Sequence, residues 1–199
     1  ALAGTCMEAG KTAAACAIVS RMRHRGLVVD CFKATGVSLR RDILAMEDAG
    51  ARHSMIFTDL GVITTTRAVG PALTRTMITD IAVKKPDVIV FELGDGILGT
   101  YGVDAILDSA DIRAALTGVV LSANDPVAAW GGVKLLRERF GIEPCVVTGP
   151  ATDNAVGVDI VRDQLSVPAF NALTDGAGLG DCVVEAIGLG GKFPVASAQ

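Results

Sequence analysis

Residues 4–12 read Gly4-Thr5-Cys6-Met7-Glu8-Ala9-Gly10-Lys11-Thr12, and this stretch decides the fold class. Apolar residues precede it and an alanine-rich stretch follows it, which predicts a loop between a strand end at 1–3 and a helix over 11–25. Backbone N–H groups of such a loop can surround a phosphate chain at the N-terminus of the helix. Lys11 is placed to reach the terminal phosphates, and the hydroxyl of Thr12 is placed to ligate magnesium. The stretch therefore predicts a site for a magnesium-bound nucleoside triphosphate.

The spacing of this loop differs from the commonest phosphate-binding form, GxxxxGK followed by Ser or Thr. Thr5 stands five residues before Gly10, and the glycine lies one residue earlier at Gly4. An ordinary glycine turn that contains Lys-Thr by chance is the alternative. The strand end, the helix and the strands that follow favour a phosphate-binding loop (P-loop). The residues expected to contact the nucleotide are Gly4, Thr5, Glu8, Ala9, Gly10, Lys11 and Thr12.

Strand and helix patterns alternate along the rest of the chain. Apolar or β-branched runs predict strands at 27–32, 87–92, 118–122, 144–148 and 167–173. Helical spacing and capping residues predict helices at 40–49, 71–83, 103–116, 126–140, 153–165 and 181–187. Residues 51–70 show no regular pattern. The alternation predicts a three-layer α/β/α P-loop NTPase fold with a mostly parallel sheet and its ligands at the carboxyl ends of the strands.

Length and composition narrow the remaining classes. A chain of 199 residues fits a single nucleotide-binding domain over 1–199, and the short first strand predicts a fragment of a longer chain with an upstream domain. Half of the residues are apolar, but polar or charged residues interrupt every run before the ~18 needed to span a bilayer. The net charge of −4 offers no general surface for nucleic acid or a membrane. Five cysteines without a CxxC pair indicate a reducing, cytoplasmic setting.

The first 45 residues resemble dethiobiotin synthetase and its relatives, which include the cobyrinic acid a,c-diamide synthases. In that family the loop reads GTDTxVGKT, and the second strand leads into a KPxxSG-like segment. The counterparts here are GTCMEAGKT and Lys33-Ala34-Thr35-Gly36. The family's EGAGG signature corresponds to Glu92-Leu93-Gly94-Asp95-Gly96.

The resemblance implies roles for five side chains. Lys11 binds the terminal phosphates, and Lys33 faces the substrate and the transferred phosphoryl group. Thr12, Asp42 and Glu92 form the magnesium site. An acidic residue at the end of a central strand beside the loop is also well placed, on physical grounds, to bind the metal. The alternatives are an ordinary surface lysine at 33, a solvated helix residue at 42 and a polar strand terminus at 92.

Some positions depart from the family pattern. Ala34 replaces a proline, Asp95 replaces a small residue, and no segment matches the part that contacts the diamino acid substrate. The asparagine that reads adenine in dethiobiotin synthetase corresponds in place to Asn154, which fits a helix cap or turn equally well. The sequence therefore decides neither the acceptor nor the base.

The leading hypothesis is an ATP-dependent ligase or synthetase that activates a carboxylate or carbamate by phosphoryl transfer. It would use ATP, with GTP left open, together with Mg²⁺ and a small-molecule acceptor, and the resemblance allows a homodimer. The alternative is a nucleotide-dependent regulatory or accessory (switch) domain of a larger protein. The short start and the unmatched acceptor segment favour that second hypothesis.

Overall fold

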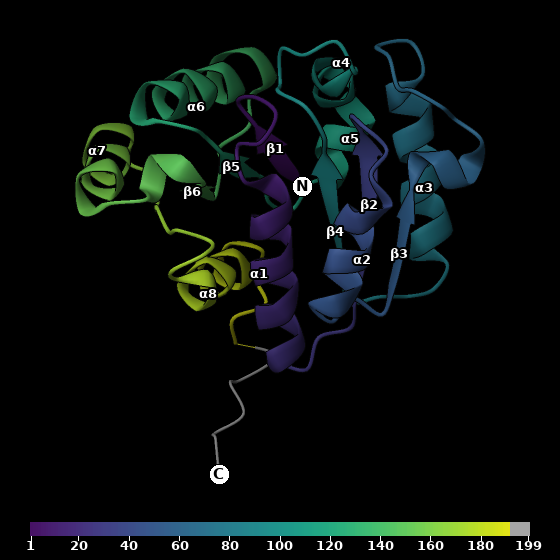
Figure 1. Ribbon diagram of the computed structural model, residues 1–199, viewed down its shortest axis with the longest axis horizontal. Coiled ribbons are helices and arrows are strands. Elements are labelled where there is room, and N and C mark those ends of the chain that lie inside the picture. Colours follow the sequence, from purple (N-terminus) through teal and green to yellow (C-terminus); the bar gives the residue numbers. More distant parts are fainter. Residues whose placement is uncertain (192–199) are drawn as a thin grey trace.

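The computed structural model in Figure 1 describes residues 1–191, so the last eight residues of the predicted domain lie outside the described part. Among the described residues, six parallel strands form one sheet in the order β3-β2-β4-β1-β5-β6. The strands are β1 (Leu2–Gly4), β2 (Val29–Thr35), β3 (His53–Ile56), β4 (Val88–Leu93), β5 (Val120–Ser122) and β6 (Val146–Thr148). The carboxyl ends of all six strands therefore lie on the same side of the sheet, as parallel strands require.

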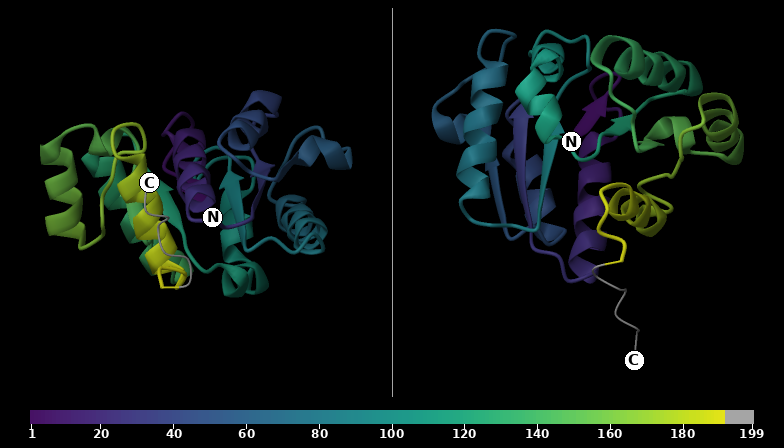
Figure 2. Two further views of the ribbon diagram at one scale, coloured as in Figure 1. Left: turned by 90° about the horizontal axis from the view of Figure 1, so that it is seen from below. Right: turned by 180° about the vertical axis from the view of Figure 1, so that it is seen from behind.

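Helices cover both faces of this sheet, which confirms the predicted three-layer α/β/α fold (Figure 2). The core on one face joins α1 to α8, and the core on the other face joins α3, α4 and α6. No helix among residues 1–191 has the length and apolar character to cross a bilayer. The helices are α1 (Lys11–His24), α2 (Arg40–Asp48), α3 (Gly70–Ala82), α4 (Val103–Asp108), α5 (Ala110–Ala115), α6 (Pro126–Phe140), α7 (Ala155–Leu165) and α8 (Gly176–Ala186), with short 3₁₀ turns η1 (Phe57–Leu60) and η2 (Pro150–Thr152).

Three sequence-based expectations about elements were wrong. The irregular stretch 51–70 contains β3, whose four residues are too few to show a clear period. The helix expected at 103–116 breaks at Ser109, which has an extended backbone between α4 and α5.

The strand expected at 167–173 is reduced to one bridge, between Val147 and Ala169. Pro168 has no N–H to donate, and the side-chain oxygen of Asn171 accepts from the backbone N–H groups of Leu173 and Thr174. The chain therefore turns away from the sheet after residue 170, and the Asp175 carboxylate caps α8 by accepting from Gly178 N–H at 2.9 Å.

Alternation along β2 and β4 sends neighbouring side chains to opposite faces. Phe32 and Phe91 stack on the α3 face with ring centroids 4.6 Å apart. Lys33 and Glu92 directly follow them and are paired in register across the two strands. They therefore point together to the face that carries α1, next to the end of β1.

The loop after β6 packs directly against the P-loop. Gly149 has a φ of 91°, and a Cβ on it would lie 2.3 Å from the backbone oxygen of Ala9 and 2.8 Å from that of Ala123. Only glycine fits this conformation and this close approach. The position of the P-loop thus depends on a backbone contact from the loop after β6, a strand that lies two places from β1 in the sheet.

We predict that Gly149→Ala destabilises the protein by at least about 1–2 kcal/mol, because the new Cβ meets two backbone oxygens at a positive φ. The free energy of unfolding from urea denaturation measures the effect. Gly131→Ala is the matched control, since a Cβ on this exposed face of α6 meets nothing within 4 Å, and it should be neutral or stabilising. Equal stability of the two variants would contradict the prediction.

Candidate functional site

The P-loop joins the end of β1 to the first turn of α1, and its backbone donors are free. Within the described residues, no acceptor takes the backbone N–H groups of residues 10–13, and no side chain caps α1. The first turn of a helix carries such orphan donors and a partial positive charge. This arrangement is suited to an anion, and phosphate groups fit it well.

Lys11 folds back over the loop and is almost fully buried. Its ammonium donates to the backbone oxygen of Cys6 at 2.8 Å. A Cβ at Gly4 would lie 2.7 Å from Nζ and 2.9 Å from Cδ of Lys11, so the glycine at this unusual position makes room for the lysine. Burial lowers the pKa of Lys11, and the nearby carboxylate of Glu92 partly offsets this effect. The lysine is therefore held as a poorly solvated cation beside the free N–H groups.

Glu92 lies at the end of β4, and its two carboxylate oxygens have different partners. Oε2 accepts from the hydroxyl of Thr12 at 2.9 Å, and Oε1 lies 3.7 Å from the ammonium of Lys33. Glu92 is only 3% exposed. The structure thus brings together the strand-end carboxylate and the P-loop hydroxyl, which are eighty residues apart in sequence.

Asp42 lies in the first turn of α2, and its Oδ2 accepts from the ammonium of Lys33. Both side chains are buried, which differs from the surface alternatives that the sequence left open for them. Asp42 contacts Lys33 rather than Thr12 or Glu92. Its role as a magnesium ligand stays a prediction, as do those of Thr12 and Glu92.

These side chains open onto one pocket of about 430 Å³. Its lining includes Met7, Glu8, Gly10, Lys11, Thr12 and Ala13 from the P-loop side and Lys33, Val37, Leu39, Arg41, Asp42, Glu92, Gly94 and Asp95 from the other side. Among the described residues, no cluster of three or more His, Cys, Asp or Glu side chains is arranged to hold a metal alone. Magnesium commonly uses one or two protein carboxylates, phosphate oxygens and water, so Glu92 with Thr12 fits this ion.

Around the rim of the pocket, which Gly94 lines, are contacts that the sequence did not predict. Thr35 donates its hydroxyl to the oxygen of Gly94 at 2.9 Å, and Gly36 N–H donates to the buried hydroxyl oxygen of Thr65 at 3.3 Å. Arg67 forms an ion pair with the buried carboxylate of Asp104. The loops after β2, η1 and β4 are therefore joined. The Thr64-Thr65-Thr66 run was visible in the sequence, but no pattern linked it to the site.

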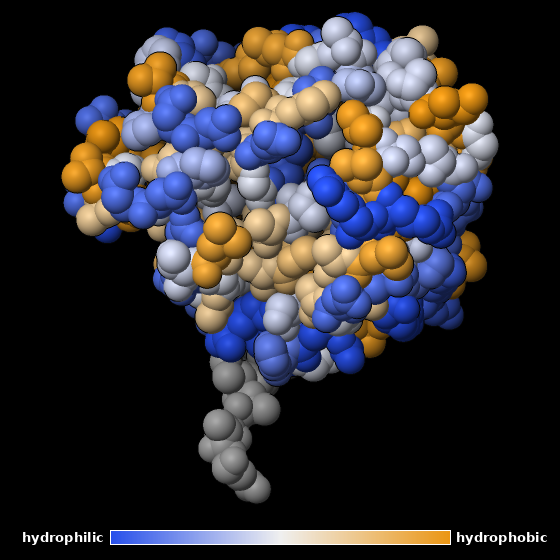
Figure 3. All heavy atoms as spheres, in the orientation of Figure 1, coloured by the Kyte–Doolittle hydropathy of each residue, from blue (hydrophilic) through white to orange (hydrophobic). Residues whose placement is uncertain are grey.

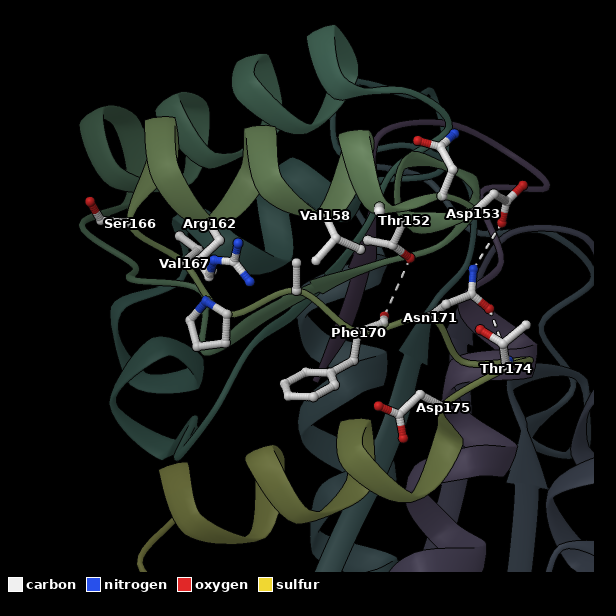
Figure 4. A pocket seen from close by; sticks show the side chains of 14 residues that line it. Thr152, Asp153, Val158, Arg162, Ser166, Val167, Phe170, Asn171, Thr174 and Asp175 are labelled. Carbon is white, nitrogen blue, oxygen red and sulfur yellow. Dashed lines mark hydrogen bonds between the residues drawn. The ribbon is translucent and has the colours of Figure 1, made fainter.

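A second pocket of about 800 Å³ lies between α7, the segment 166–171 and α8 (Figure 4). Asn171 donates to Asp153 at 2.8 Å there, and Asn154 caps α7 by accepting from Gly157 N–H at 3.0 Å. The helix-cap alternative for Asn154 is thus the observed one. Although this pocket is larger, its lining contains none of the side chains around the P-loop.

Comparisons with known proteins support the fold but do not show a family. No protein-family model matches the chain, and no curated protein matches it. Solved structures do: the signal recognition particle receptor FtsY from Elizabethkingia anophelis superposes with a TM-score of 0.62 and 15% identity, over 91% of this chain and 63% of that one. Chloroplast FtsY from Physcomitrella patens gives a TM-score of 0.56 and 15% identity, over 94% and 63%. The chain thus spans less than two thirds of the length of these proteins, and the likeness confirms a P-loop NTPase fold.

Proposed function

We propose that this domain binds a magnesium-bound nucleoside triphosphate in the P-loop pocket and transfers or hydrolyses its terminal phosphoryl group. The observation that carries the proposal is the 2.9 Å contact between Thr12 and the buried carboxylate of Glu92, beside the free N–H groups of α1. Thr12 and Glu92 would hold the metal, which neutralises charge on the phosphates when bound. Lys11 and the loop amides would bind the phosphate oxygens and stabilise the charge that develops on them.

ATP-dependent ligation is the more specific form of this proposal. The pocket continues past the phosphate side of the loop to a wall that contains Lys33, Val37, Leu39 and Arg41. A small acceptor with a carboxylate or carbamate would fit between the cations and the apolar side chains of this wall. ATP is the nucleotide implied by the resemblance to dethiobiotin synthetase, and GTP is the competing candidate.

A nucleotide-dependent switch is the second candidate, and the joined loops at the rim favour it. Contacts between Thr35 and Gly94, and between Gly36 and Thr65, connect the pocket to loops that lead into α3 and α4. A ligand that moved one loop would therefore act on the others. The two similar structures are named as FtsY, one of them as a signal recognition particle receptor, and a receptor acts through a protein partner.

Stimulation of phosphate release separates the two candidates. A ligase should hydrolyse triphosphate slowly alone and at least about ten-fold faster with its carboxylate acceptor, whereas a switch should change its affinity for a protein partner with the nucleotide state. Acceptor-independent turnover together with partner binding would favour the switch.

Lys11→Met should lower the affinity for a non-hydrolysable ATP or GTP analogue by at least about 100-fold, because charge-assisted hydrogen bonds to phosphate are lost. The same variant should be at least as stable as the wild type. The pKa of Lys11 is lowered in the folded state, so its charge opposes folding below that pKa, and this penalty is relieved as the pH rises towards the value in the unfolded chain. Calorimetric titration measures the analogue affinity, and urea denaturation measures the stability. Unchanged analogue affinity would contradict the assignment of residues 4–12 as a phosphate-binding loop.

Glu92→Gln should weaken the dependence of binding on magnesium more than binding itself, because the amide keeps the shape but loses the charge that attracts the metal. We expect the ratio of analogue affinity with Mg²⁺ to that with EDTA to fall by about ten-fold or more. Glu138→Gln, on the exposed face of α6, is the control and should leave the ratio unchanged. A fall in both affinities by the same factor would instead indicate a general loss of the pocket.

A further inference from the structure

Lys33 occupies the space between two buried carboxylates. Its ammonium donates to Asp42 and lies 3.7 Å from Oε1 of Glu92, while the other oxygen of Glu92 accepts from Thr12. The exposed side-chain fractions are 6% for Lys33, 12% for Asp42 and 3% for Glu92. Two buried carboxylates on either side of one ammonium need that cation, since an uncompensated buried charge is strongly destabilising. In the free protein Lys33 supplies that cation.

The other charged groups around Lys33 do not replace it. Arg41 is 3.8 Å from the second oxygen of Asp42, but its side chain is 81% exposed and therefore largely screened by water. Lys11 is near Glu92 but donates to the backbone oxygen of Cys6. Asp95 lines the same pocket and adds a further negative charge.

We propose that Lys33 is an exchangeable internal counter-ion, which neutralises Glu92 in the free protein and yields that carboxylate to magnesium when nucleotide binds. This inference rests on the proposed function. Lys33 and a metal at Thr12 and Glu92 compete for one carboxylate, because two cations a few ångströms apart repel each other in a poorly solvated site. Asp42 keeps hold of the displaced lysine and is a positioning residue for it, in place of the metal-ligand role that the resemblance implied.

The displacement of Lys33 from Glu92 would affect the surface of the molecule through α2. Asp42 belongs to the first turn of this helix, and the preceding residues 37–41 are exposed at the mouth of the pocket. Hydrophilic and hydrophobic side chains lie next to one another over this part of the molecule in Figure 3, and the segment itself exposes Val37 and Leu39. Loss of the contact between Lys33 and Glu92 would uncouple the start of α2 from β4, while the ammonium stays on Asp42.

A double-mutant cycle on Lys33 and Asp42 tests the exchange. The measured quantity is the ratio of analogue affinity with Mg²⁺ to that with EDTA, for wild type, Lys33→Met, Asp42→Asn and the double variant. Lys33→Met should raise the ratio by about ten-fold or more, because the competing cation is gone. Asp42→Asn should lower it by about ten-fold, because the lysine then stays on Glu92. In the Lys33→Met background the same Asp42→Asn change should lower it by no more than about three-fold.

A second measurement covers the case in which Lys33→Met is poorly folded. Thermal unfolding without ligand should rank the double variant above Lys33→Met, because the second substitution removes one of the two unpaired carboxylates. The double variant then provides a folded reference without the lysine, and its ratio should exceed that of Asp42→Asn alone by at least about thirty-fold. Lys134→Met, on the exposed face of α6, is the control for loss of a lysine and should change neither measurement.

The outcomes separate this inference from the function on which it rests. A wild type that binds neither the ATP nor the GTP analogue overturns both. A wild type that needs magnesium, with an equal loss of at least ten-fold for Asp42→Asn in both backgrounds, makes Asp42 a direct ligand and overturns the exchange alone. An unchanged ratio in both Lys33→Met and the double variant overturns it as well.

Discussion

The buried carboxylate of Glu92 needs donors on both of its sides, and the site is organised around this requirement. Thr12 satisfies one oxygen from the start of α1, and Lys33 approaches the other from β2. A charge 3% exposed at the end of a central strand would be costly without them. Because the two donors belong to different elements, one acidic side chain fixes the P-loop helix against the strand that leads to α2.

The parallel register makes this arrangement possible. Lys33 and Glu92 pair directly across β2 and β4, one position after the stacked Phe32 and Phe91. Rings that pack in the core on one face therefore place the two charges at the same height on the other face. A slip of one residue between these strands would turn the charges into the core. The apolar packing of the sheet thus sets the geometry of the polar site.

Local patterns predicted the P-loop, α1 and the three layers, because loop glycines, helical spacing and apolar runs act over a few residues. The contact between Thr12 and Glu92 was foreseen only as shared membership of a metal site. The pairing of Lys33 with Asp42 was not foreseen, because it depends on how α2 packs on β2 and no spacing rule describes that. Strand β3 was missed for its shortness, and the loop contact of Thr65 lacked any local signal.

The segment after β6 has a consequence for the sheet edge, where strands of other chains can add. The carbonyl oxygen of Pro168 accepts from the N–H of Val147, and the N–H of Phe170 donates to the carbonyl oxygen of Val147. The backbone groups of this segment that face outward therefore belong mainly to Ala169. The next outward carbonyl, on Asn171, already accepts from the N–H of Asp175 at 2.8 Å. An incoming strand would find too few free groups to form a ladder. The residues that interrupt the strand expected at 167–173 therefore leave another chain little to pair with at this edge.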